Sequence, residues 1–144
     1  MLQPKRRFFF LSTPVGPLGS GLGGGVELTL LNLSQELLQR GHEVTIIAPA
    51  GSQLATVPVV GIEGQLQPTA HTQERQASVS MPDNSVLANM CDYVYHRQDQ
   101  VDLIVNFAYD WLPFYLTPFF QCPLAHFVTM GSLSDAIDSA IHRV

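Results

Sequence analysis

The sequence predicts an α/β fold, a doubly wound parallel sheet with helices on both of its faces. Short apolar runs alternate along the chain with segments of helical periodicity, which is typical of this class. Residues 7–48 alone read as strand, helix and strand, and two parallel strands need a crossover of this kind. The 144 residues are enough for one domain with one core.

The first three elements carry the clearest patterns. Residues 7–12 form an apolar run that ends in a Ser/Thr/Pro cluster, as buried strands do. From Val26 apolar residues recur at steps of four, three and four, which predicts an amphipathic helix ending before Gly41. Residues 43–48 are rich in β-branched side chains and stop at Pro49, so they predict a second buried strand.

The middle of the chain is less regular. Residues 56–62 predict a short third strand, which we expect at an edge because it contains a proline. Residues 63–81 are rich in Gln, Thr and Ser without periodicity and predict a mobile surface loop. A helix capped by Asp83 or Asn84 should follow and run to about residue 98.

The last part of the chain repeats the alternation. Residues 101–107 predict a fourth strand, apolar enough to be covered on both faces. Residues 111–120 predict a short helix broken by a proline, and residues 124–129 a fifth strand. Ser132 or Ser134 then caps a last helix.

Composition excludes several classes of protein. The net charge of -5 argues against nucleic-acid binding, which needs clustered cations. No apolar stretch is long enough to span a membrane, and the apolar run after Arg7 is too short for a signal peptide. The two cysteines, Cys91 and Cys122, are too few for a zinc site or a disulfide scaffold, so we expect a cytoplasmic protein without a metal.

A glycine-rich loop separates the first strand from the first helix. Gly19, Gly21 and Gly24 satisfy the dinucleotide pattern G-x-G-x-x-G, which would suggest an NAD(P)-dependent oxidoreductase. However, the first of these glycines lies far from the strand, and the second strand ends in Ala48-Pro49-Ala50 without an acidic residue. A P-loop is excluded because no Gly-Lys-Ser/Thr follows. The loop predicts either a site for an anion or oxygen at a helix N-terminus, or simply a tight connection.

Two motifs at a fixed spacing carry a family resemblance. The run Gly23-Gly24-Gly25 leads into a helix that ends in Arg40-Gly41-His42, with Val44 two residues further on. This arrangement resembles the start of family 4 retaining glycosyltransferases of the GT-B fold. The resemblance continues more weakly through residues 102–105 and Pro123. It implies a Rossmann-like doubly wound sheet, the N-terminal domain of a GT-B fold.

A closer resemblance is carried by residues 12–21 and 106–111. These segments look like those of cyanobacterial enzymes that glucosylate tetrahydrobiopterin from UDP-glucose. The resemblance implies transfer of a hexose to a small acceptor, with retention of configuration and with the nucleotide sugar as donor substrate rather than any cofactor.

The resemblance also bears on domain organisation. It implies that residues 1–144 are a truncated N-terminal, acceptor-binding domain whose partner is its own C-terminal, donor-binding domain. No paired-glutamate motif of such a second domain occurs in this sequence, so we expect these residues alone to be inactive. The alternatives are an oxidoreductase or a non-catalytic α/β binding module.

Ligands of parallel sheets lie at the carboxyl ends of the strands. Four stretches should therefore meet at one rim, namely residues 13–25, 49–53, 106–111 and 129–132. Asp110 is the carboxylate best placed on this rim to accept a proton from an acceptor hydroxyl, and we predict it as the catalytic residue. The alternatives are that Asp110 is an ordinary surface residue, or that a phosphate oxygen of the substrate is the base, as in many family 4 enzymes.

The remaining candidates would bind substrate. Backbone N–H groups of the glycine loop should meet donor phosphate or acceptor, and Glu27 either binds the acceptor or favours the helix dipole. Aromatic residues gather in residues 107–120, where they either stack on a heterocycle such as a pterin or fill the core. The predicted binding residues are Gly23, Gly24, Gly25, Glu27, Asn106, Tyr109, Trp111, Thr129 and Ser132.

Two histidines are assigned no chemistry. Many family 4 enzymes have a histidine at the end of the fifth strand, where this sequence has Thr129. His126 lies three residues earlier, a step that does not preserve the strand face, so we expect it in the core or at an edge. His42 follows the first helix, and we expect it to be structural on the rim opposite the cleft.

Overall fold

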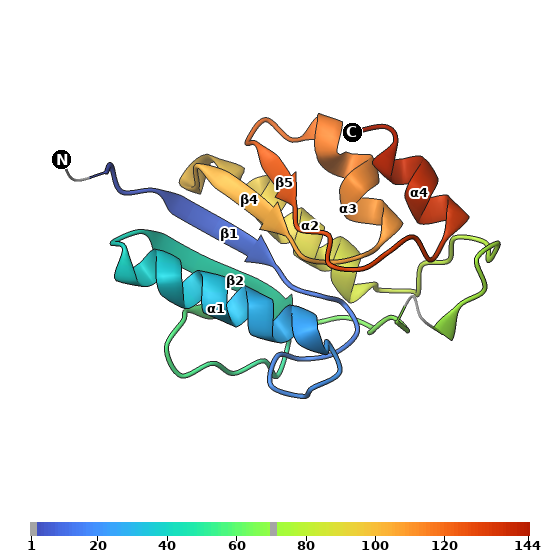
Figure 1. Cartoon of the computed structure of the whole chain (residues 1–144), viewed down its shortest axis with the longest axis horizontal. Helices are drawn as coiled ribbons and strands as arrows, with labels where there is room; N and C mark the ends of the chain where they lie inside the picture. Colours follow the sequence, from blue (N-terminus) through green and yellow to red (C-terminus); the bar gives the residue numbers. More distant parts are fainter. Residues whose placement is uncertain (1–2, 70–71) are drawn as a thin grey trace.

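The computed structural model describes residues 3–69 and 72–144. It confirms the α/β class, because five parallel strands form one sheet in the order β3-β2-β1-β4-β5 (Figure 1). The chain therefore builds outward from β1 in one direction and then in the other, and the reversal lies between β1 and β4. The strands are β1 (Arg7–Leu11), β2 (Glu43–Pro49), β3 (Val59–Ile62), β4 (Leu103–Asn106) and β5 (Leu124–His126).

Helices cover both faces of the sheet. In Figure 1 α1 lies in front of β2, whereas α2 lies behind β4. α3 and α4 pack on each other beyond β5, and a 3-10 helix, η3, follows α3. The helices are α1 (Gly25–Gln39), α2 (Val86–His96), α3 (Trp111–Leu116) and α4 (Asp135–Ile141), with η2 (Gln98–Gln100) and η3 (Thr117–Phe119).

The alternation of side chains along β1 divides the core in two. Phe10 is fully buried on the α1 side and pairs with Ile46 and Val105 in the neighbouring strands. Phe9 and Leu11 point to the opposite face and pack with α2. Each fully buried side chain of this size contributes about 1.5–3 kcal/mol, so β1 anchors both halves of the core.

Several predicted boundaries differ in the structure. Ser85 caps α2, since its hydroxyl accepts a hydrogen bond from the Ala88 N–H, whereas Asn84 adopts a positive φ of 52° in the preceding turn. The fifth strand ends at His126, three residues before its predicted end. The predicted edge position of β3 is confirmed, and α3 gives way to η3 next to Pro118.

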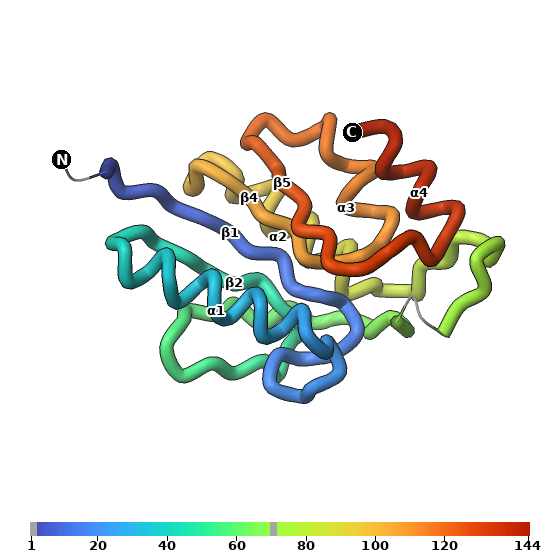
Figure 2. Tube along the Cα trace, viewed as in Figure 1, coloured from blue at the N-terminus to red at the C-terminus, as the bar shows by residue number. Residues whose placement is uncertain are grey.

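Residues 63–85 connect β3 to α2, and we call this segment the strap. Its two ends are joined, because the Gln65 N–H donates to the Asn84 carbonyl and the Val86 N–H donates to the Gln65 carbonyl. Figure 2 shows the strap in green at the end of the molecule toward which the strands point, beside α4. Residues 70 and 71, part of the predicted mobile loop, lie outside the described residues.

Helix lengths bear on membrane insertion. Within residues 3–69 and 72–144, every helix is too short or too polar to cross a bilayer.

Candidate functional site

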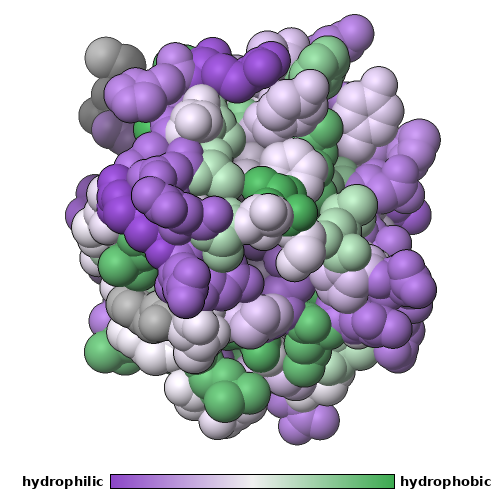
Figure 3. All heavy atoms as spheres, turned by 90° about the vertical axis from the view of Figure 1, so that its right-hand side faces the viewer, coloured by the Kyte–Doolittle hydropathy of each residue, from purple (hydrophilic) through white to green (hydrophobic). Residues whose placement is uncertain are grey.

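A cleft of about 540 Å³ opens at the carboxyl ends of β1 and β4. This is where the strand order reverses, the usual ligand position in such sheets. Figure 3 views this end of the molecule, with pale and apolar residues near its centre and hydrophilic residues to the left of the centre and along the right-hand side. Its walls are Thr13–Val15, Leu22–Val26 with Thr29, Pro68 and Thr69 of the strap, Phe107, Tyr109 and Asp110, and Thr129 and Met130.

The glycine loop forms one wall and is held from within. The carboxylate of Glu27 turns back and accepts hydrogen bonds from the N–H groups of Gly23 and Gly19, each at 3.4 Å. Gly24 occupies the N-cap of α1 without a side-chain cap, so the amides of Gly25 and Val26 have no partner within the helix. Both residues line the cleft, and such amides suit an anion or a polar oxygen.

Asp110 lies at the wall formed by the end of β4. It caps α3, because its Oδ1 accepts from the Leu112 N–H at 3.3 Å, and its Oδ2 accepts from Gln67 Nε2 at 2.9 Å. Burial raises the pKa of the Asp110 carboxyl above its ordinary value, while these two hydrogen bonds and one from the Trp111 backbone oppose that rise. Asp110 is the one charged side chain among the described lining residues, so the cleft brings no cation.

Tyr109 and Thr129 also line the cleft, as the sequence predicted for residues at the strand ends. The hydroxyl of Tyr109 accepts a hydrogen bond from the Leu133 N–H at 3.1 Å, which holds the ring against the loop after β5. Phe107 stacks on Phe127, with ring centroids 5.4 Å apart. The cleft therefore combines rings, hydroxyls, backbone amides and one carboxylate.

Residues 23–128 match the family model described as Glycosyltransferase Family 4. The chain belongs to glycosyltransferase family 4. The match begins at the last glycines of the loop and ends beyond β5, so it spans most of the sheet that builds the cleft. It supports a transferase that uses a nucleotide sugar and an acceptor, and the N-terminal domain of a GT-B fold. A comparison with curated proteins gives no significant match.

Four predicted residues lie outside the lining of the cleft of this family 4 domain, namely Glu27, Asn106, Trp111 and Ser132. Asn106 is 1% exposed and its amide bonds the backbone of Ala108 on both sides. Trp111 packs edge-on against Tyr115 inside the helical layer. Glu27 supports the glycine loop rather than entering the cleft. Residues 49–53 are also set back, since Ser52 Oγ accepts from the Leu18 N–H and thereby braces that loop.

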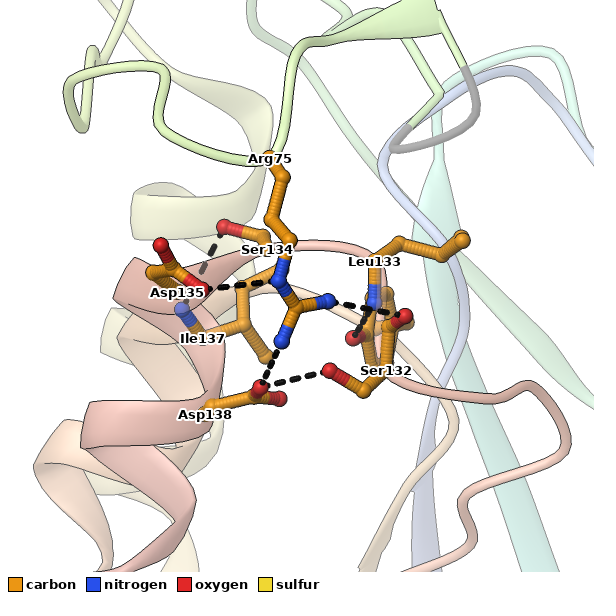
Figure 4. Close-up of polar contacts among 8 residues, drawn as sticks. Arg75, Ser132, Leu133, Ser134, Asp135, Ile137 and Asp138 are labelled. Carbon is orange, nitrogen blue, oxygen red and sulfur yellow. Dashed lines mark hydrogen bonds and ion pairs between the residues drawn. The ribbon is translucent and has the colours of Figure 1, made fainter.

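Ser132 belongs to a polar network that fastens the strap to α4 (Figure 4). Arg75 of the strap forms ion pairs of 2.9 Å with both Asp135 and Asp138. It also donates to the Ser132 carbonyl, while the Ser132 hydroxyl donates to Asp138. The network joins the strap to the segment that follows the Thr129 wall of the cleft.

His126 stands at the end of β5, the position that the sequence analysis gave to Thr129. Because Asn106 Oδ1 accepts from the Ala108 amide, its Nδ2 must face His126 Nδ1, 3.0 Å away. His126 Nε2 therefore carries the proton and donates to Thr117 Oγ1 at 2.8 Å. Burial lowers the pKa of His126 to about 4, so the ring is a neutral part of the packing against α3.

His42, the second histidine considered in the sequence analysis, lies on the rim opposite the cleft. His42 Nδ1 accepts from the Arg6 N–H at 3.1 Å, and its ring meets Phe8 edge-on. This contact is structural.

The strap contributes the residues that the sequence analysis missed. Pro68 and Thr69 line the cleft and Gln67 holds Asp110. Their surroundings are aperiodic and polar, so the local sequence carries no signal for them. The end of β1 shows a second feature that the sequence analysis did not predict. The hydroxyls of Ser12 and Thr13 are buried without a hydrogen-bond partner among the described residues.

Proposed function

We propose that this domain binds a small neutral acceptor and presents its hydroxyl group for the transfer of a hexose, glucose from UDP-glucose, with retention of configuration. The observation that carries the proposal is the position of Asp110, a lone carboxylate in a cleft whose opposite wall offers free amides of α1. Family membership supplies the class of reaction.

The lining favours an uncharged acceptor. A phosphorylated acceptor would bring negative charge next to Asp110 with no Lys or Arg among the described lining residues to offset it. Hydrogen bonds are available instead from threonines of α1, of the strap and of the segment after β5, and Tyr109 and Phe107 offer ring surface. A pterin such as tetrahydrobiopterin, with a planar ring and a hydroxylated side chain, fits these features. These threonines are Thr29, Thr69 and Thr129.

The lack of cations in the described lining also bears on how the donor is bound. The amides of Gly25 and Val26 can bind one phosphate oxygen, but a diphosphate needs cations that the described lining lacks. We therefore propose that a second, donor-binding domain completes the site, and that residues 1–144 bind the acceptor without turnover. Two free cysteines agree with a cytoplasmic setting.

The chemistry assigned to Asp110 is general base catalysis. The acceptor oxygen forms a bond to C1 of the hexose on the same face from which the diphosphate leaves, which retains the configuration, while its proton passes to the Asp110 carboxylate. The bond between C1 and the diphosphate oxygen breaks, and its electron pair leaves with the nucleoside diphosphate. Amides at the start of α1 would stabilise the charge that develops there.

Ligand titration of the chain tests this proposal. We expect biopterin to quench intrinsic fluorescence and Asp110→Asn to weaken its binding about 10-fold or more, because a hydrogen bond to a charged group contributes about 1.5–3 kcal/mol. Asp99→Asn, on η2 at the other end of the sheet, is the matched control and should bind normally. NADH binding that is tighter than binding of biopterin and UDP-glucose would favour an oxidoreductase instead.

Turnover is tested with the full-length protein that the gene encodes. Supplied with UDP-glucose and biopterin, it should form a glucosylated product that mass spectrometry detects, and Asp110→Asn should slow its formation about 100-fold or more. An unchanged rate would remove Asp110 from the chemistry and leave a substrate phosphate oxygen as the base.

A further inference from the structure

Gln67 joins three parts of the cleft. Its backbone N–H donates to the Pro14 carbonyl after β1 at 2.9 Å. Its side-chain Nε2 donates to Asp110 Oδ2 at 2.9 Å, and its Oε1 accepts from the Ser85 hydroxyl at 3.3 Å. One residue of the strap therefore connects the end of β1, the cap of α2 and the cap of α3.

The direction of these hydrogen bonds is determined by the groups at their two ends. The Ser85 hydroxyl accepts from the Ala88 N–H at 3.2 Å, so it has its proton free to donate to Gln67. An ionised Asp110 can only accept, so the amide nitrogen of Gln67 must face it. The result is a directed chain from the first turn of α2 through Ser85 and Gln67 to Asp110. Bonds in such a chain polarise and strengthen one another.

Without Gln67, Asp110 would be held weakly. Its other contacts come from the backbone at the start of α3, a helix of six residues, where the Leu112 N–H donates at 3.3 Å and the Trp111 N–H also acts on the carboxyl. Contacts from the start of α3 alone approach the carboxylate from one side. Two contacts from different directions fix its plane, and each oxygen keeps a lone pair for a ligand.

We propose that Gln67 is the positioning residue of the cleft, which orients the Asp110 carboxylate toward the acceptor hydroxyl. This inference rests on the proposed function for the role of Asp110, whereas the geometry of the pair stands without it. Misplacement of a reacting group by about 1 Å can cost about 100-fold in rate, so a residue of this kind affects chemistry that it never touches.

The surroundings of Asp110 make its charge sensitive to this one contact. The hydrogen bond from Gln67 lowers the pKa of Asp110 and so opposes the effect of burial. Among the described residues, the thiol of Cys91 of α2 lies close enough for the charge of Asp110 to raise its pKa. Burial raises the pKa of the Cys91 thiol to about 12, so it stays neutral over the working pH range. Loss of the Gln67 contact should therefore raise the pKa of Asp110 further.

Three variants of the chain separate positioning from anchoring. Gln67→Met removes both side-chain hydrogen bonds at similar length. Gln67→Glu keeps an oxygen for Ser85 but places a carboxylate against Asp110, so the strap stays anchored while the contact is reversed. Asn89→Met is the matched control, because the Asn89 amide of α2 holds both ends of the strap, by donating to the Glu63 carbonyl and to Asn84 Oδ1, outside the described cleft lining.

The readouts are the pKa of Asp110, from carbon-13 NMR of its carboxyl in the free chain, and the dissociation constant of biopterin. We expect Gln67→Met to raise the pKa and weaken biopterin binding about 3- to 10-fold. Gln67→Glu should raise the pKa more, and Asn89→Met should change neither quantity. A Gln67 variant that behaves like Asn89→Met, or a smaller rise with Gln67→Glu than with Gln67→Met, overturns the inference.

The two readouts also distinguish this inference from the proposed function. If the wild-type chain does not bind biopterin but the pKa of Asp110 moves as expected, the positioning role stands and the proposed acceptor is wrong. If biopterin binds and Gln67→Met changes neither the pKa nor the affinity, the acceptor proposal survives and the role of Gln67 is lost.

Discussion

The glycine loop and the strap wall the same cleft but are built on opposite principles. The part of the glycine loop at the cleft is held by its own neighbourhood, through Glu27 and the start of α1, while Ser52 braces the loop further back at Leu18. The strap is held at a distance, by Gln67 on Asp110 and by Arg75 on α4. Backbone geometry like that of the glycine loop requires glycine residues, which can be recognised in the sequence. Pairing between polar side chains far apart in the chain produces no such local pattern.

The largest effect should come from the backbone of the glycine loop. Gly24 has a φ of 60° and a ψ of −141°, which a side chain tolerates poorly, although an added Cβ would meet no atom. Gly24→Ala should lower the free energy of unfolding by about 1–3 kcal/mol, measured by urea denaturation. Gly25→Ala is the control, because its Cβ also meets open space but its φ is not positive. Equal losses would show that strain is not what holds this loop.

A smaller effect is expected at the end of β1, where the two walls meet. The Thr13 hydroxyl is buried without a partner among the described residues, and such a group costs about 1–3 kcal/mol. Thr13→Val should therefore raise the free energy of unfolding by about 1 kcal/mol. Ser12→Ala should raise it too, although Ser12 is not among the residues that line the cleft. A drop in stability for Thr13→Val would mean that its hydroxyl is bonded in solution.

The smallest effect is expected in the strap. Arg75 is half-exposed, so its pairs with Asp135 and Asp138 are screened by water, and Arg75→Gln should cost less than about 1 kcal/mol. The loss should shrink in 1 M salt, unlike that of Gly24→Ala. Arg40→Gln, which breaks one exposed pair with Glu36 on α1, should cost less still. Faster amide exchange at Asp135 in Arg75→Gln alone would show that the strap has come loose.

The order of elements and the rim of the site could be predicted, because both follow from local patterns. Hydrophobic periodicity gave β1, α1 and β2, and the rule for parallel sheets placed Asp110 and Tyr109 at the cleft. Trp111 follows Tyr109 by only two residues, but α3 begins at Trp111. The helix directs the Trp111 ring into the helical layer and away from the cleft. Where a short helix begins depends on its cap, and a sequence cannot rank competing caps.

The same limit explains the other differences. Asp83, Asn84 and Ser85 are all of residue types that often cap helices. Ser85 is the one that caps α2, because the bridge between Gln65 and Ser85 at the two ends of the strap fixes where the helix begins. The short β5 follows from its single neighbour, since β4 ends at Asn106 opposite His126 and offers no further partners. Contacts between residues this far apart in the chain cannot be predicted from hydrophobic periodicity.

The joined ends of the strap have a consequence for how this domain can change. Gln65 pairs with Ser85, so the chain between β3 and α2 is closed at its base. Doubling the length of such a closed loop costs only about 0.6 kcal/mol in chain entropy. Insertions and deletions can therefore accumulate in one wall of the cleft while the sheet is untouched, which makes the strap the part of this fold best suited to acquiring new acceptors during evolution.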